Sequence, residues 1–384
     1  MVIKVNVIKK LISIMLIIGI CIPLSGCWNY RGLNTLSVFT GIAIDRNEEN
    51  NNYQLTIEFI DFSETSKKEP SKSQLIEVEG KTIFEAIRNA KRKLAKKLYM
   101  GDLKVVIISN QIAREEGINS ILDFFTRDAE MRETVIPVLS QEKTAKEVLM
   151  ANGVDNKIVS EDLERIIKSG WKTTASSKNV NICKTFNVLH GKDEISLVLP
   201  AVHCKNNKEK KIVELNGTAI FKGDKLKGYL SPEETYTYLL ATNEINRGII
   251  TVPLNDSQDK IVLELEKNKT KMSYSYNENR LKIFLDMSSV VKVSEVNFDI
   301  DLSKRETIEE FRSAAKLQSL QRLESLINKG KKELNCDILG VGTMIHKNDP
   351  ELWYKLREDW DYYIQTMEVE IRHDFVITNT GLTK

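Results

Sequence analysis

The chain has 384 residues, of which 41% are hydrophobic and 29% are charged. This balance is typical of a water-soluble globular protein and excludes a polytopic membrane protein and an intrinsically disordered chain. The formal net charge is +2, and residues 1–26 contain three lysines and no acid, so the remainder carries 2 − 3 = −1. A protein that follows a phosphate backbone needs a surplus of Lys and Arg, which argues against a nucleic-acid partner.

The N-terminus has the pattern of a secretory signal. Three lysines precede the hydrophobic run Leu11–Ile22, and small residues follow it. The run has about a dozen residues, whereas a helix that spans a bilayer needs about 20, so we expect no permanent membrane span. Leu24-Ser25-Gly26-Cys27 resembles the bacterial lipobox. The resemblance implies that residues 1–26 are a lipoprotein signal peptide that is removed, leaving Cys27 with S-diacylglycerol and N-palmitoyl groups.

Two other interpretations of this segment stay open: an uncleaved anchor, and an ordinary signal with an incidental cysteine. Only a thiol can be alkylated in the lipidation reaction, and small side chains before Cys27 suit a peptidase cleft. Acyl chains bury methylene groups at about 0.8 kcal/mol each, so a doubly acylated tether is stable without a transmembrane helix.

Strand and helix patterns alternate through the first half of the chain. Strands are predicted at Leu36–Asp45, Tyr53–Phe62, Leu103–Ser109, Val135–Leu139 and Ile195–Val202, and helices at Thr82–Leu98, Ile112–Arg127, Thr144–Met150 and Ser160–Lys168. The continuous apolar run Val105–Ile108 predicts a strand that is covered on both faces. Ser63–Ser73 is charged, contains Pro70 and predicts a loop. The alternation predicts a mixed sheet with helices packed on it.

The helix predicted at Thr82–Leu98 has one apolar stripe and one basic face. The basic face consists of Arg88, Lys91, Arg92, Lys93, Lys96 and Lys97. Three interpretations are open: a face exposed to solvent, contact with an acidic partner, and contact with anionic lipid headgroups, which is worth about 1 kcal/mol per residue.

The second half contains two predicted boundaries. The polar run Lys205–Lys211 is the clearest break in the chain. A small unit follows, in which Ser231 and Pro232 open a helix as N-cap and first helical residue. From Lys260 onward we expect strands at Ile261–Lys267, Met272–Tyr276 and Leu281–Val291, helices at Glu306–Gly330 and Pro350–Tyr363, and a strand at Val369–Thr378. The predicted domains are therefore residues 27–204, 205–259 and 260–384.

No motif in the chain indicates metal binding. None of the four histidines has a ligand spacing such as His-Glu-x-x-His. Cys183, Cys204 and Cys336 include no Cys-x-x-Cys pair for zinc, and their odd number makes no disulfide framework. We expect these three thiols to be reduced and buried, as free cysteines usually are.

Catalytic and nucleotide-binding motifs are also missing from the sequence. Gly80-Lys81-Thr82 lacks the first glycine of a P-loop, and Gly340-Val341-Gly342 lacks the third glycine of a dinucleotide-binding turn. There is no Gly-x-Ser-x-Gly elbow. We therefore predict no catalytic residue, no cofactor and no metal ligand, so that Cys27 is the only predicted site residue.

A series of short motifs runs along the whole chain. In order they are Gly26-Cys27-Trp28, Gly41–Asp45, Leu98–Val105, Arg127–Arg132, Asn216–Phe221, Lys225–Leu230, Asp337–Gly342, Pro350, Trp353, Trp360 and Gly381. In this order and behind a lipobox, the chain resembles the GerC-type spore germination lipoproteins, the C subunits of GerA-type nutrient germinant receptors. It departs from their pattern at Asn29 and Gly32, where acidic residues are expected, and at Asp102, where His is expected.

The resemblance implies an α+β fold of three consecutive domains, each a central sheet flanked by helices. It also implies a non-enzymatic subunit, held by lipid on the outer face of the spore inner membrane beside integral-membrane A and B subunits and needed for nutrient-triggered germination. It implies no cofactor, and direct small-molecule binding stays open. Trp353 and Trp360 are interpreted as core residues, with a surface role as the alternative.

Two other function classes stay open. A solute-binding lipoprotein that feeds a transporter usually has two doubly wound lobes joined by a hinge. A lipid-anchored envelope enzyme would bring His, Asp or Glu side chains together in a deep cleft.

Overall fold

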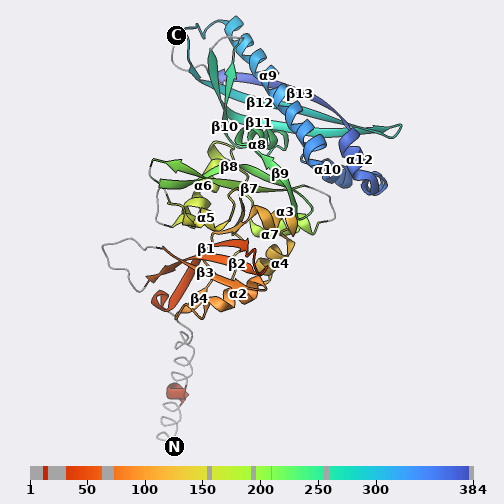
Figure 1. Ribbon diagram of the computed structural model, residues 1–384. Helices are drawn as coiled ribbons and strands as arrows, with labels where there is room; N and C mark the ends of the chain where they lie inside the picture. The colour runs from red at the N-terminus through yellow and green to blue at the C-terminus, as the bar shows by residue number, and fades with distance from the viewer. Residues whose placement is uncertain are drawn as a thin grey trace, which may run out of the picture.

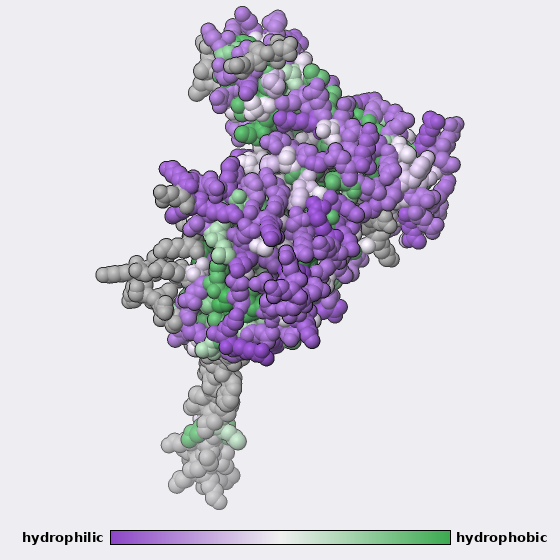
Figure 2. All heavy atoms as spheres, viewed as in Figure 1, coloured by the Kyte–Doolittle hydropathy of each residue, from purple (hydrophilic) through white to green (hydrophobic). Residues whose placement is uncertain are grey.

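The computed structural model describes residues 12–15, 32–62, 73–153, 158–191, 196–208, 210–254 and 259–379. Within these ranges the strands form two sheets, one of nine strands and one of four. Figure 1 shows the nine-stranded sheet in the lower and middle part of the molecule and the four-stranded sheet at the upper end. On the face drawn in Figure 2 most of the surface is hydrophilic, and hydrophobic residues form small separate areas.

The first sheet has parallel strands in its centre and antiparallel strands on both sides. Its order is β3-β2-β1-β5-β6-β7-β8-β9, with β4 paired to β1. Strands β1, β5, β6 and β7 run parallel. The bounds are β1 Leu36–Arg46, β2 Tyr53–Asp61, β3 Ser73–Gly80, β4 Lys97–Tyr99, β5 Val105–Ile108, β6 Ile136–Ser140, β7 Leu197–Asn207, β8 Lys210–Lys222 and β9 Lys225–Leu230.

Helices cover both faces of this sheet. They are α2 Ile83–Ala90, α3 Asn110–Glu115, α4 Asn119–Arg127, α5 Lys146–Met150, α6 Val159–Thr173 and α7 Ile182–Leu189. All four residues of β5 are buried, Val106 and Ile108 in the core beneath α2, α3, α4 and α7, and Val105 and Ile107 in the core beneath α5 and α6. The prediction of a strand covered on both faces is confirmed.

The second sheet packs against helices through one of its faces. Its strands are β10 Gly248–Pro253, β11 Lys260–Asn277, β12 Arg280–Val296 and β13 Glu368–Asn379, in that order. The helices are α8 Pro232–Ala241, α9 Arg305–Asn328, a π-helical segment Lys329–Leu334, α10 Val341–Asn348, α11 Pro350–Leu356 and α12 Trp360–Thr366. Buried and exposed side chains alternate along β12, the two-residue period of a half-covered sheet. Trp353 and Trp360 are buried in this core with ring centroids 5.0 Å apart, so their assignment as core residues is confirmed.

The ends of several helices differ from those predicted. The helix predicted to reach Leu98 stops at Ala90, because residues 97–99 form β4 beside β1 and tertiary pairing outweighs helix propensity. The helix predicted at Ile112–Arg127 is divided by Gly117, whose φ of +94° an α-helix cannot contain. Strand β3 and helix α7 were not predicted.

The strands of the second sheet are longer than predicted. Two predicted strands, Ile261–Lys267 and Met272–Tyr276, are one strand, β11, which continues through a polar stretch because β12 pairs with it along its length. A two-residue turn follows, in which Glu278 and Asn279 both have positive φ angles of 51° and 61°.

The predicted middle domain, residues 205–259, is divided between the two sheets. The described residues of the run Lys205–Lys211 form the end of the β7–β8 hairpin. The run is polar because it lies at a turn exposed to solvent, and both strands that it connects belong to the first sheet. Strands β8 and β9 pair within the first sheet, whereas α8 packs into the core of the second sheet, to which β10 belongs. The division of the chain into three domains stays a prediction.

Candidate functional site

The predicted lipid-attachment residue Cys27 lies outside the described residues, as does the rest of the lipobox. After residues 12–15, the described chain resumes at Gly32, five positions after Cys27, and β1 begins at Leu36. Within the described part of the chain, no helix is both long enough and apolar enough to span a bilayer.

The carboxyl ends of the central parallel strands are the usual ligand site of sheets of this kind. Asp45 lies there, next to the last residue of β1, and its carboxylate is buried. It accepts hydrogen bonds from the backbone N–H groups of Ala145 and Lys146 at 2.7 and 2.9 Å, where α5 begins. Burial raises the pKa of Asp45, and the two donors oppose that rise. The carboxylate therefore fastens α5 to the sheet.

Glu58 on the neighbouring strand β2 has the same role for α6. Its buried carboxylate accepts hydrogen bonds from the N–H groups of Val159 and Ser160, both at 2.9 Å, in the first turn of that helix. The helix approaches β1 so closely that a Cβ atom at Gly41 would lie 2.8 Å from the Cβ of Ser160. Gly41 is therefore required for the packing of α6 on β1, and Glu58 satisfies amides that a helix N-terminus otherwise leaves without acceptors.

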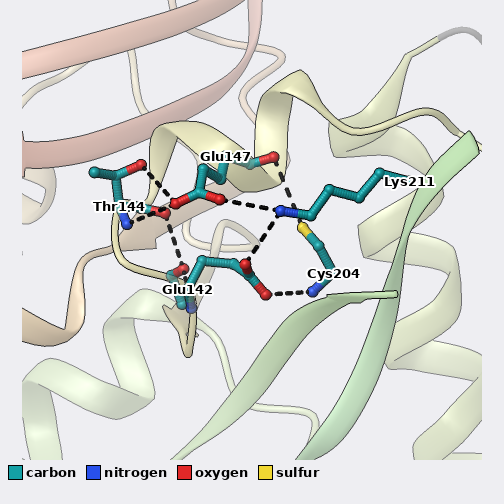
Figure 3. Close-up of polar contacts among 6 residues, drawn as sticks. Glu142, Thr144, Glu147, Cys204 and Lys211 are labelled. Carbon is teal, nitrogen blue, oxygen red and sulfur yellow. Dashed lines mark hydrogen bonds and ion pairs between the residues drawn. The ribbon is translucent and has the colours of Figure 1, made fainter. Parts of the chain in front are cut away.

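A polar network closes the end of β6. Lys211 on β8 places its Nζ 3.3 Å from Glu142 and 3.0 Å from Glu147. The backbone N–H of Cys204 donates to Glu142 at 2.7 Å, and Thr144 donates to Glu147 through its N–H and its hydroxyl (Figure 3). The hydrogen bond from Lys211 holds the pKa of Glu147 below its usual value. These polar groups therefore satisfy one another at the end of β6.

The three described cysteines are free thiols. Cys336 is buried as expected, whereas Cys183 and Cys204 are only partly buried. Burial raises the pKa of Cys204 to about 11, with a further rise from Glu142. A thiol with this pKa stays protonated at neutral pH, so Cys204 is a poor nucleophile.

The histidines lie apart and contact different elements. His373 is buried between the hydroxyls of Ser289 and Ser319, at 2.8 and 2.7 Å, and burial lowers its pKa to about 4. It is therefore neutral at pH 7 and joins β12 and β13 to α9. His190 stacks on Phe186 in α7. Within the described ranges, no three His, Cys, Asp or Glu side chains are grouped so that they could hold a metal ion.

Several hollows among the described residues have room for a small molecule. A groove of about 900 Å³ lies between α6 and the β7–β8 hairpin, where Glu214 pairs with Lys205 at 3.3 Å. A cavity of about 430 Å³ between the two sheets contains Lys178, whose Nζ lies 3.0 Å from both Tyr238 Oη and Glu244 Oε1. Burial lowers the pKa of the Lys178 amine, but Tyr238 and Glu244 outweigh this and leave the pKa above its usual value. A paired, protonated amine of this kind is neither a base nor a nucleophile.

Two family models match the chain in succession. The model of the spore germination protein N-terminal domain matches residues 29–204, and that of the spore germination B3/GerAC-like C-terminal domain matches residues 216–381. The chain belongs to the GerC-type spore germination protein family. Its GerC-type relatives in Bacillus subtilis (strain 168) include Spore germination protein KC, which is 24% identical over 97% of this chain and 96% of its own length. Spore germination protein B3 is 22% identical over 94% of this chain and 95% of its own length.

A solved structure, the crystal structure of the GerBC protein, has the same fold. It matches with a TM-score of 0.61 and 18% sequence identity, and the match covers 88% of this chain and 97% of that chain. The GerC-type fold of mixed sheets flanked by helices is therefore confirmed.

Two of the motifs that carry the GerC-type resemblance have structural roles in the described part of the chain. In the motif Asn216–Phe221, Gly217 has a φ of +79°, and a Cβ atom there would lie 1.9 Å from the carbonyl oxygen of Leu230. In the motif Asp337–Gly342, the buried Asp337 carboxylate accepts the N–H of Gly342 at 2.7 Å. A Cβ atom at Gly342 would meet the Trp353 ring at 2.9 Å. These motifs maintain turns and close packing, and they lie in different parts of the fold.

Proposed function

We propose that this chain is a lipid-anchored, non-catalytic subunit of a nutrient germinant receptor in the spore inner membrane. It faces outward from that membrane and lies beside the integral-membrane A and B subunits. The observation that carries the proposal is the lipobox Leu24–Cys27 at the head of a chain that belongs to the GerC-type family. The S-diacylglycerol and N-palmitoyl groups on Cys27 hold the chain at the bilayer.

The chemistry of the described side chains supports a role in assembly. The buried carboxylates Asp45 and Glu58 bind backbone amides of helices, and His373 is neutral between two serines. General acid–base catalysis needs a group whose pKa lies near the working pH and which can reach a substrate. Asp45, Glu58 and His373 are instead used to join elements of the fold.

Germination of spores that carry Cys27→Ala tests the anchor. We expect these spores to lose most of their response to nutrients and to respond normally to a non-nutrient trigger, because only the receptor pathway depends on the tether. Cys21→Ala is the matched control, since Cys21 lies within the apolar run of the leader and is removed with it. A normal nutrient response in Cys27→Ala spores would contradict the proposal.

Mass spectrometry of the mature N-terminal peptide tests the lipid directly. We expect a peptide that begins at Cys27 and carries the diacylglycerol and the additional acyl chain. Crosslinking in spore membranes should join the chain to two integral-membrane proteins. A mature protein with an intact leader and an unmodified Cys27 would exclude the anchor.

A further inference from the structure

The beginning of β1 and a basic segment lie at the same end of the first sheet. Strand β4 pairs in parallel with the beginning of β1, with Leu36 opposite Lys97. The turn that connects α2 to β4 therefore ends beside the first residue of β1. We call Lys91, Arg92, Lys93, Lys96 and Lys97 in this turn and strand the basic edge. Figure 1 shows α2 and β4 at the lower end of the folded body, opposite the second sheet.

The basic edge carries more positive charge than its partners neutralise. Lys96 forms an ion pair with Asp61, and Lys97 lies 3.4 Å from Glu130. Lys91 donates to the carbonyl oxygens of residues 95 and 96, and Lys93 donates to that of residue 77, and these oxygens carry no formal charge. The carboxylate of Glu79 also attracts Lys93. Five cations against three carboxylates leave 5 − 3 = +2. The excess is local, because the chain beyond residue 26 has a net charge of −1.

The surroundings of the basic edge suit a lipid surface. Leu33, three residues before β1, is 58% exposed. Figure 2 shows the lower end of the body covered mainly by hydrophilic residues, with a narrow hydrophobic strip beside them. Proteins that lie on membranes combine cations for the headgroups with exposed apolar side chains for the acyl boundary.

The tether is short enough to bring this edge to the bilayer. Gly32 lies five positions after Cys27, and five residue steps span at most about 18 Å. Charges on an anionic leaflet act over a Debye length of about 8–10 Å at physiological salt. A chain anchored through Cys27 therefore cannot move Gly32 farther than about 18 Å, or about two Debye lengths, from its anchor.

We propose that the basic edge binds anionic phospholipid headgroups and sets the chain upright on the membrane. The first sheet then rests on the bilayer through the ends of α2 and β4, and the second sheet points away from it. The position of the anchor rests on the proposed function, but headgroup binding itself needs no lipid on the chain.

Vesicle sedimentation of the mature chain with Cys27→Ala tests headgroup binding without the anchor. We expect binding to vesicles of phosphatidylcholine mixed with phosphatidylglycerol, little binding to phosphatidylcholine alone, and loss of binding at high salt. The triple variant Lys91→Gln, Arg92→Gln and Lys97→Gln should lower the partition coefficient roughly a hundredfold at low salt, at about fivefold per charge. Arg92→Gln alone changes one exposed side chain and should lower it about fivefold.

The matched control removes three exposed lysines at the far end of the molecule. Lys267→Gln, Lys269→Gln and Lys271→Gln on β11 change the net charge equally, and we expect binding to stay within about twofold of the parent chain. Circular dichroism checks that all variants fold. Equal binding to both vesicle types, or equal loss in the control, would overturn the proposal. So would binding to polyglutamate without binding to vesicles, which would indicate an acidic protein partner.

The experiments test the proposed anchor and the proposed headgroup site independently. Vesicle binding together with an unmodified Cys27 in spores would remove the proposed anchor and keep the basic edge. A lipidated Cys27 that is needed for germination, combined with no preference for anionic vesicles, would remove only the basic edge.

Discussion

Carboxylates that bind helix amides act over different sequence distances in the two sheets of this molecule. In the first sheet, the buried Asp45 and Glu58 accept hydrogen bonds from amides 100 to 102 residues later in the chain. Beside the second sheet, Asp337 accepts from amides four and five residues later, at the start of α10, and Asp349 from one three residues later, at the start of α11. The first two acids join separate parts of the fold, whereas each of the other two shapes the start of the helix that follows it.

The position of the acid explains the difference. Parallel strands such as β1, β5 and β6 need crossover connections, which place helix N-termini above a sheet formed by distant residues. The first amides of those helices have no acceptor within the helix, and a buried acid on the sheet provides one. The second sheet also has a helical crossover, between the parallel strands β12 and β13, but there Asp337 and Asp349 lie within the crossover itself, next to the helices whose amides they bind. We infer that the buried acids of the first sheet are structural, and this can be tested by their removal.

Glu58→Ala should have the largest effect. It leaves the N–H groups of Val159 and Ser160 buried without an acceptor, and each lost bond to a charged group costs about 1.5–3 kcal/mol. We expect the free energy of unfolding to fall by about 3–5 kcal/mol in urea denaturation. Hydrogen exchange at these two amides should accelerate more than exchange in α9, because the damage begins at the start of α6.

Glu77→Ala on the adjacent strand β3 is the control for this change. The Glu77 side chain is 44% exposed and pairs with Lys146 at 2.6 Å, and an exposed ion pair of this kind contributes about 0–1 kcal/mol. If Glu58→Ala cost no more than Glu77→Ala, the buried acid would not be fastening α6, and the contrast between the two sheets would not hold.

His373→Gln should have an intermediate effect that depends on pH. Burial lowers the pKa of His373 from 6.5 to about 4. Asp374 raises this pKa by a smaller amount, and Lys316 lowers it slightly further. Because the folded pKa is the lower one, the unfolded chain takes up the proton first as the pH falls. The stability that the neutral ring provides is therefore complete above about pH 6.5 and is lost toward pH 4, by about 2–3 kcal/mol.

Glutamine keeps a donor and an acceptor for Ser289 and Ser319 but does not titrate. The difference in unfolding free energy between the parent chain and His373→Gln should therefore shrink by about 2 kcal/mol from about pH 7 to about pH 4.5. Urea denaturation at the two pH values measures it. A difference that stays constant with pH would mean that His373 is protonated as readily in the folded chain as in the unfolded one.

Local patterns predicted much of the fold. The apolar run of β5, the repeat of α9 and the N-cap at Ser231 each depend on residues within a few positions of one another. The end of α2 and the existence of β3 were missed, because both depend on pairing with strands elsewhere in the chain. The same limit applies to residues 205–259, since the pairing of their strands with two different sheets depends on residues elsewhere in the chain.

The same distinction between local and long-range signals applies to the site residues. The prediction of Cys27 depends on a local signal, four adjacent residues behind an apolar run, and it stays a prediction. The roles of Asp45, Glu58 and Lys211 could not be predicted, because the backbone amides and carboxylates that their side chains bind lie 64 to 102 positions away. The sequence alone indicates the basic residues after Ala90, but their position beside the beginning of β1 follows only from the pairing of β4 with β1.

Asp349→Ala should have the smallest effect and completes the contrast. The Asp349 side chain accepts the N–H of Leu352 at 3.0 Å as the N-cap of α11, and loss of such a cap costs about 1 kcal/mol. Asp349→Asn keeps a capping oxygen and should cost only a few tenths of that. Thermal unfolding followed by the fluorescence of buried Trp353 measures both. If Asp349→Ala cost as much as Glu58→Ala, local and long-range capping would be equivalent in this fold, and sequence distance would not separate the two sheets.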